Sequence, residues 1–107
     1  MKKYLVMRSE RAVYDLDDIC GYISTNLGNS KAAEDMYNRF RDKIKSLEYS
    51  PKRNRLIDND DPHLIGVRIA HEGKYNIFYK IEDGHNVVLI LAILYSGIDI
   101  SKIKLDI

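Results

Sequence analysis

Eight consecutive apolar residues, 87–94, constrain this 107-residue chain more than any other feature of its sequence. A strand with one face toward water alternates apolar and polar residues, and this run has no alternation. Residues 87–95 are therefore predicted to form a central strand that is covered on both faces. Such a strand needs a partner along each edge, and the opening segment 3–8 is one candidate.

Two further strands are predicted before this run, over residues 64–70 and 75–81, with a turn at 71–74. Asp83-Gly84 is a strong signal for a two-residue hairpin turn between the last two strands. Successive side chains of a strand point to opposite faces. One face of the middle strand is expected to carry Tyr75, Ile77, Tyr79 and Ile81, and the other Asn76, Phe78 and Lys80.

The N-terminal half predicts two antiparallel helices. Ser9 is expected to cap the first helix and Gly28 to end it, whereas Asn29 or Ser30 begins the second and Pro51 stops it. The apolar stripes comprise Ala12, Val13, Leu16, Ile19, Cys20, Ile23 and Leu27, then Ala33, Met36, Tyr37, Phe40, Ile44 and Leu47. The predicted fold is one α+β domain over residues 1–107, in the order β-α-α-β-β-β. Its small, mainly antiparallel sheet packs on a helical hairpin.

Composition excludes several functional classes. Seventeen Lys and Arg residues against sixteen Asp and Glu leave a net charge of +1, so nucleic-acid binding would need a local basic patch. Cys20 is the single cysteine and is expected to be a buried, inert thiol in a reducing, cytoplasmic compartment. No apolar stretch has the length of a membrane span, so no membrane partner is expected.

Acidic residues fall in two groups, and neither predicts a site. Asp15, Asp17 and Asp18 are expected on a solvated helix face. Residues 49–63 are expected to form a mobile, solvated loop that runs from basic (Lys52, Arg53, Arg55) to acidic (Asp58, Asp60, Asp61). This loop lacks the central glycine and closing glutamate of a calcium loop. No metal and no cofactor is therefore predicted, and nucleotide-binding or nucleophile-elbow motifs are missing from the sequence.

Segments spread over nearly the whole chain carry a family resemblance. They are residues 8–12, 15–16 and 19–23; the Ala32-Ala33 helix; Ile44, Leu47 and Ser50-Pro51; Gly66-Val67-Arg68; Tyr75 to Ile81; and Ile93 to Asp99. In this order and spacing they resemble the RelE/ParE superfamily of bacterial toxins from type II toxin–antitoxin modules. The resemblance implies a small sheet on a helical hairpin and a role as the toxic member of a two-protein operon.

The resemblance also implies where a site would lie. RNA-cleaving members carry cationic and acid–base residues on the sheet, and Arg68 matches one cationic position. Asn76 stands where a second arginine is usual, and Tyr95-Ser96-Gly97 replaces the usual terminal basic element. The catalytic candidates, if the chain is an enzyme, are therefore Arg68, Tyr79 and Tyr95. The target-binding candidates are Arg53, Arg55, Arg68, Lys74 and Asn76.

Structural roles compete with these assignments. Arg68 could instead form an ion pair at the sheet edge, and the aromatic residues of the middle strand could simply be core. His63, His71 and His85 fall in predicted turns or the loop, where surface histidines are usual. Arg68→Ala is expected to leave folding largely intact and to weaken toxicity.

The ending Ile93 to Asp99 is closer to the ParE-like branch, whose members are associated with inhibition of DNA gyrase. The expected function is therefore a toxin that inhibits a target such as gyrase without RNA cleavage. A cognate antitoxin is expected to neutralise it, to bury apolar surface that includes the tail (Ile100, Ile103, Leu105, Ile107), and to be its only link to operator DNA. The alternatives are a ribosome-dependent mRNA endoribonuclease with a non-standard active site and a non-toxic interaction module.

Overall fold

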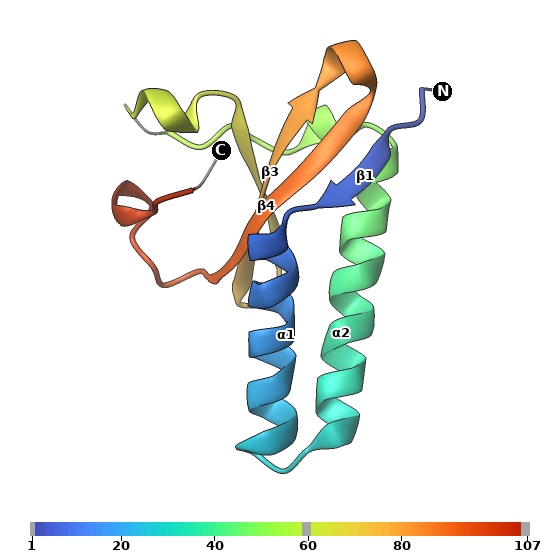
Figure 1. Cartoon of the computed structure of the whole chain (residues 1–107), viewed down its shortest axis with the longest axis vertical. Helices are drawn as coiled ribbons and strands as arrows, with labels where there is room; N and C mark the ends of the chain where they lie inside the picture. The colour runs from blue at the N-terminus through green and yellow to red at the C-terminus, as the bar shows by residue number, and fades with distance from the viewer. Residues whose placement is uncertain (1, 59–60, 106–107) are drawn as a thin grey trace.

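A computed structural model describes residues 2–58 and 61–105 of the chain. Two helices pack against one side of a four-stranded sheet with the strand order β1-β4-β3-β2 (Figure 1). β1 pairs with β4 in parallel, and the other two pairs are antiparallel. The α+β fold and the element order predicted from the sequence are therefore confirmed. The elements are β1 (Leu5–Arg8), α1 (Glu10–Thr25), α2 (Ser30–Lys45), β2 (Val67–Glu72), β3 (Tyr75–Glu82) and β4 (Val87–Tyr95).

The two helices begin as the sequence predicts. The Ser9 hydroxyl accepts a hydrogen bond from the Ala12 N–H, and the Asn29 side chain accepts one from the Ala32 N–H. Figure 1 shows that the far end of the hairpin extends beyond the sheet. Leu27, which was predicted in the core, lies at this end and is exposed, as is Val13. Cys20 is only half-buried at the edge of the core.

β4 is central and covered on both faces, as its unbroken apolar run predicts. Phe78 of β3 pairs with Ala92, but Tyr79 pairs with Ile90, so Leu91 is an extra residue in β4. This β-bulge places Leu91 and Ala92 together on the face away from the helices. The strict alternation of β3 is kept across the bulge: Tyr75, Ile77, Tyr79 and Ile81 face the helices, and Phe78 faces away.

The C-terminal tail covers the second face of the sheet. Ile103 and Leu105 are buried there against β2, β3 and β4, and Ile57 and Leu64 complete this second core. The apolar tail was predicted to be a free surface for a partner, but most of it is buried inside the fold. Ile107 lies outside the described residues. The reason is that a sheet with an apolar central strand must be covered on both faces.

Several predicted boundaries are wrong. β2 begins at Val67 because Leu64 belongs to a short 3-10 turn, and it continues to Glu72, so His71 lies in the strand. The turn before β4 spans four residues, and the left-handed position is Asn86 (φ 54°) rather than Gly84. α2 ends at Lys45, well before Pro51.

The connection after α2 was predicted to be mobile and solvated, but it is anchored. Pro51 and Ile57 are buried, and Leu56 forms an isolated bridge with Arg68 of β2. Backbone hydrogen bonds join Ile57 to Val67 and Arg55 to Ile69. This segment therefore seals the outer edge of β2, while Asp60 lies outside the described residues.

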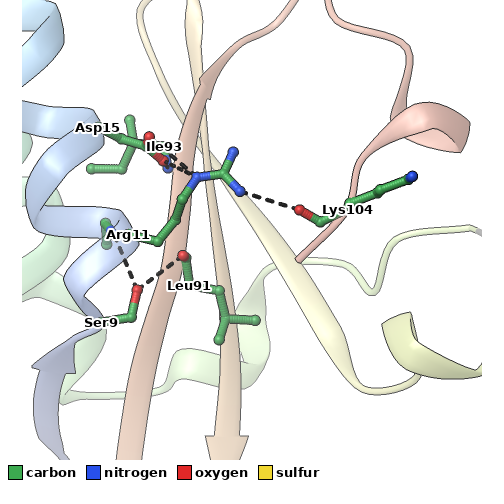
Figure 2. Close-up of polar contacts among 7 residues, drawn as sticks. Ser9, Arg11, Asp15, Leu91, Ile93 and Lys104 are labelled. Carbon is green, nitrogen blue, oxygen red and sulfur yellow. Dashed lines mark hydrogen bonds and ion pairs between the residues drawn. The ribbon is translucent and has the colours of Figure 1, made fainter. Parts of the chain in front are cut away.

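The junction of β1 and α1 fastens the helices to the sheet (Figure 2). β1 ends at Arg8, opposite Ile90, so the backbone of β4 beyond this point has no strand on that side. The Ser9 hydroxyl donates to the Leu91 carbonyl at 3.0 Å, and the Asp15 carboxylate accepts from the Ile93 N–H at 3.0 Å. Side chains of α1 thus replace the missing strand, as buried backbone groups require.

Asp15 was predicted on a solvated face, and this prediction is wrong. Its side chain is only 11% exposed and forms an ion pair with Arg11, whose Nε lies 3.2 Å from Oδ2. The Arg11 guanidinium also donates to the Lys104 carbonyl at 3.2 Å, which ties the tail to the same point (Figure 2). The periodicity of the helix placed Asp15 outside the apolar stripe and gave no sign of the β4 backbone opposite it.

Replacement of Asp15 should therefore destabilise the fold. Asp15→Ala leaves the Ile93 N–H without its partner, which should lower the free energy of unfolding by about 1–3 kcal/mol. Urea denaturation followed by circular dichroism measures this change. Asp18→Ala, on the exposed side of the same helix, is the matched control and should stay within about 0.5 kcal/mol of the wild type. Equal effects of the two substitutions would contradict the assigned role of Asp15.

Candidate functional site

Arg68 and Tyr79 lie opposite each other on β2 and β3, beneath the segment that follows α2. The Arg68 guanidinium donates to the Lys52 carbonyl at 3.2 Å and to the Asn54 carbonyl at 2.6 Å. The Tyr79 hydroxyl donates to the Pro51 carbonyl at 2.5 Å. The ion pair considered for Arg68 is not seen among the described residues, and Nη1 of its guanidinium donates to two main-chain oxygens instead.

Arg53 also binds main-chain carbonyls of this segment. Its guanidinium donates to the carbonyls of Ser46, Tyr49 and Ser50, at 3.2, 2.8 and 3.2 Å. The last carbonyls of a helix lack partners within the helix, and Arg53 supplies donors where the chain leaves α2. Ser50 adopts a left-handed conformation (φ 51°) that turns the chain back toward the sheet. Arg53 is thus bound into the architecture through one edge of its guanidinium.

Tyr79 is fully buried, and this burial raises the pKa of its hydroxyl, although the neighbouring charges of Arg68 and Arg53 oppose the shift. A proton-transfer group must reach its substrate and must titrate near the working pH. Tyr79 meets neither condition, so the fold does not support its predicted catalytic role. It is a core residue whose hydroxyl satisfies the Pro51 carbonyl.

Asn76 is also buried, with 5% of its surface exposed. Its Oδ1 lies 2.6 Å from Nδ1 of His71, the residue opposite it on β2. The Asn76 side chain is therefore largely covered in this fold, and its contact with a target stays a prediction. His71 is exposed on the strand and covers the Asn76 amide.

Lys74 and Tyr95 lie at the opposite end of the sheet from Arg68. Tyr95 is exposed at the end of β4, and its ring meets Tyr75 edge to face with centroids 6.1 Å apart. Tyr75 in turn meets Phe40 of α2 at 5.5 Å. These three rings form a row from the rim of the sheet to α2.

A cleft of about 340 Å³ opens beside this row, between α2 and the turn from β2 to β3. Its floor is apolar, and two cations, Arg39 and Lys74, line it together with Glu72. The complete lining is Met36, Arg39, Phe40, Glu72, Gly73, Lys74 and Tyr75. A cleft of this kind can hold an apolar or aromatic side chain with a carboxylate beside it.

The fold therefore divides the predicted site residues into two groups. Arg53, Arg55 and Arg68 surround the segment after α2, where Arg55 is exposed, whereas Lys74, Asn76 and Tyr95 lie at the other end of β3. Sequence reasoning missed Arg39 and Glu72, the other charged residues of the cleft. Nothing in the periodicity of α2 marks Arg39, because only the tertiary packing brings its turn of helix to the hairpin.

Other chemistry is poorly represented in the described part of the chain. No group of three His, Cys, Asp or Glu residues among residues 2–58 and 61–105 could hold a metal ion. Burial, reinforced by the nearby charge of Asp17, raises the pKa of the Cys20 thiol and makes its reactive thiolate less abundant. Among these residues, no helix is both long and apolar enough to cross a membrane.

Comparison with known proteins places the fold. The family described as the ParE toxin of the type II toxin–antitoxin system, parDE, matches residues 6–100. No curated protein sequence is similar enough to the chain to count as a match.

Solved structures share the architecture at low sequence identity. A chain of the chromosomal ParDE TA system from P. aeruginosa gives a TM-score of 0.69 at 16% identity, over 89% of this chain and 98% of that one. A RelBE toxin–antitoxin complex from Mycobacterium tuberculosis gives 0.59 at 21% identity, over 87% and 98%. The archaeal RelE–RelB complex from Pyrococcus horikoshii gives 0.57 at 22% identity, over 92% and 100%.

The contacts of Arg68 change the expected outcome of its replacement. Arg68→Ala removes the donor from two carbonyls of a partly buried segment, so the free energy of unfolding should fall by about 1–3 kcal/mol. Urea denaturation tests this expectation. Arg55→Ala is the control, because within residues 2–58 and 61–105 the exposed Arg55 side chain makes only a 3.4 Å contact with its neighbour's carbonyl. A stability of Arg68→Ala equal to that of Arg55→Ala would show that these hydrogen bonds contribute nothing.

Tyr79 also predicts a pH dependence of stability. Its pKa is raised in the folded state, so on alkalinisation the unfolded chain releases the phenolic proton first. Stability is therefore fully present below about pH 10 and falls as the pH rises above it. Tyr79→Phe should be less stable at neutral pH by about 1 kcal/mol, yet lose less on going to pH ~11. Urea denaturation at both pH values measures the difference, and an equal loss of stability in the wild type and Tyr79→Phe would contradict this assignment.

Proposed function

Because the chain belongs to the ParE toxin family of type II toxin–antitoxin systems, we propose that it inhibits a cellular target such as DNA gyrase by binding, without cleaving RNA. A cognate antitoxin neutralises it and provides its only link to operator DNA. If gyrase is the target, the chain acts in the cytoplasm. Similar folds have been solved as RelBE and RelE–RelB complexes, which supports an antitoxin partner for this chain.

The observation that carries the proposal is the environment of Arg68. RNA cleavage by attack of a 2′-hydroxyl needs a base, a proton donor for the leaving oxygen and cations for the phosphorane. Nη1 of the Arg68 guanidinium already donates to the Lys52 and Asn54 carbonyls, and the Tyr79 side chain opposite it is buried. No histidine or carboxylate side chain within residues 2–58 and 61–105 contacts Arg68. Arg68 and Tyr79 thus contribute to the fold, which supports a function that does not use them in phosphoryl transfer.

The cleft between α2 and the β2–β3 turn is the proposed contact with the target. It combines an apolar floor with Arg39 and Lys74 at the side, and the exposed Tyr95 ring continues the aromatic row next to it. Aromatic and arginine side chains around a pocket are the features that dominate binding energies at protein interfaces. The target would insert an apolar side chain and set a carboxylate against the two cations.

Two assays, one on the purified chain and one in cells, test this function. We expect inhibition of gyrase-catalysed DNA supercoiling, and intact transcripts when primer extension follows induction of the chain in cells. Loss of the common cationic positions costs about 10²–10³ in rate for each charge donor, which leaves cleavage negligible. Prompt, ribosome-dependent cleavage at codon-specific positions would replace this function by the endoribonuclease alternative. Absence of any growth defect or gyrase effect would favour the non-toxic interaction module.

Charge reversal in the cleft should weaken the toxin without unfolding it. Arg39→Glu combined with Lys74→Glu opposes the proposed carboxylate and should raise the concentration needed for half-maximal inhibition by at least about ten-fold. Growth after induction and the supercoiling assay both measure this change. Lys31→Glu with Lys102→Glu, which changes two exposed lysines outside the cleft, is the control. Equal inhibition by the two double variants would remove the cleft from the target interface.

A further inference from the structure

The turn that follows β4 brings Gly97 against the exposed ring of Tyr95. The Ile98 N–H donates to the Tyr95 carbonyl at 3.1 Å, which closes a tight turn. Ser96 and Gly97 stand at the centre of this turn, and the Ser96 N–H donates to the Lys74 carbonyl at 2.8 Å. The end of β4 is therefore fastened to the turn between β2 and β3, where Lys74 lines the cleft.

The backbone does not require a glycine at position 97. The described glycines with positive φ are Gly28, Gly66 and Gly73, so Gly97 has a φ that other residues adopt readily. What glycine provides at this position is space. A methyl group on Gly97 would lie 2.7 Å from Cε1 and 3.1 Å from Cδ1 of Tyr95, whereas carbon atoms pack at about 3.5–4.0 Å. The Tyr95 ring thus fills the place that a side chain on residue 97 would need.

The ring of Tyr95 is exposed, yet two neighbours hold it. Tyr95 of β4 pairs with Tyr75 of β3, and residues directly opposite each other share one face of a sheet. Their rings meet edge to face with centroids 6.1 Å apart, and Gly97 lies against the Tyr95 ring from the turn. Tyr75 also lines the cleft. The Tyr95 ring is therefore fixed beside the cleft while 53% of the residue stays exposed.

An aromatic ring that is both exposed and fixed suits a partner better than it serves the fold. The core aromatic residues Phe40, Phe78 and Tyr79 are fully buried, whereas Tyr95 adds little buried surface. Ordering a mobile side chain during association costs affinity, and a ring that is already ordered avoids this cost. Tyrosine is among the residues that contribute most to binding at protein interfaces.

We propose that Gly97 is a positioning residue for the contact with the target, because it leaves the space in which the Tyr95 ring stays ordered as an aromatic anchor beside the cleft. The Tyr95-Ser96-Gly97 element stands where the family resemblance predicts a basic element. In this chain the element meets the target with an aromatic ring in place of a cation. That the ring meets a target rests on the proposed function, whereas its placement by Gly97 does not.

Gly97→Ala tests the placement of the ring without any partner. The added methyl group should displace the ring, because an exposed tyrosine side chain can rotate away at little cost in stability. Nuclear Overhauser contacts between the ring protons of Tyr95 and Tyr75 should therefore appear in NMR spectra of the wild type and be lost in the variant. Persistence of these contacts in Gly97→Ala would overturn the proposal.

Gly84→Ala is the matched control for this substitution. Gly84 also has no positive φ, and a methyl group there would meet no described atom within 4 Å. The control should keep the contacts between the two rings. Both variants should unfold at nearly the same urea concentration as the wild type, which separates displacement of the ring from a loss of structure.

A double-mutant cycle on gyrase inhibition tests the anchor. Tyr95→Ala should raise the concentration needed for half-maximal inhibition at least about ten-fold, and Gly97→Ala at least about five-fold. When residue 95 is already alanine, Gly97→Ala should cause no further loss, because it acts through the ring alone. Gly84→Ala should inhibit as the wild type does. Additive losses in the cycle, or unchanged inhibition by Gly97→Ala, would refute the positioning role.

The two measurements separate this inference from the proposed function. If the wild type does not inhibit gyrase, the proposed function fails together with the anchoring role of Tyr95, and the NMR contacts alone decide whether Gly97 places the ring. If the wild type inhibits gyrase but the Gly97→Ala effect is absent or additive, the positioning role fails and the proposed function stands.

Discussion

The structure depends on how the backbone of β4 is satisfied after β1 ends. β4 is nine residues long and β1 only four, so half of one edge of the central strand would be left without partners in an apolar setting. The first residues of α1 fill this position, with Ser9 bonded to Ile90 and Leu91 and the Asp15 carboxylate bonded to Ile93. The helical hairpin is held against the sheet at this point, and the bulge at Leu91 sets which side chains enter each core.

Three arginines each donate hydrogen bonds to main-chain carbonyls of irregular segments. Arg11 binds the Lys104 carbonyl of the tail, Arg53 binds carbonyls at the end of α2, and Arg68 binds carbonyls of the segment beside β2. Guanidinium groups suit this task because they carry several donors and remain charged when partly buried. Irregular segments can therefore cover the sheet without leaving their main-chain oxygens unpaired. The consequence for function is that each of these cations already binds main-chain carbonyls of the fold.

Other cations line two hollows on the surface of the molecule, where a partner could contact them. Arg39 and Lys74 border the cleft at one end of the hairpin, and Arg8, Arg41 and Lys45 line a groove beside β1. The two surfaces lie on different parts of the chain, one at the turn from β2 to β3 and the other beside β1. The net charge of +1 gives no sign of these two local groups of cations, because acidic residues elsewhere in the chain balance them.

The sequence by itself determined the fold class, the order of the elements, the N-cap of the first helix and the central position of β4. Each of these follows from local periodicity, capping chemistry or the unbroken apolar run at residues 87–94, which any packing must respect. Only the tertiary structure decided the roles of Asp15, Arg68, Asn76 and Tyr79. Those roles depend on backbone groups that lie far away along the chain, as Ile93 does from Asp15 and Pro51 from Tyr79. Side-chain patterns report which face of an element is apolar, and they carry no record of which distant carbonyl or N–H group lacks a partner.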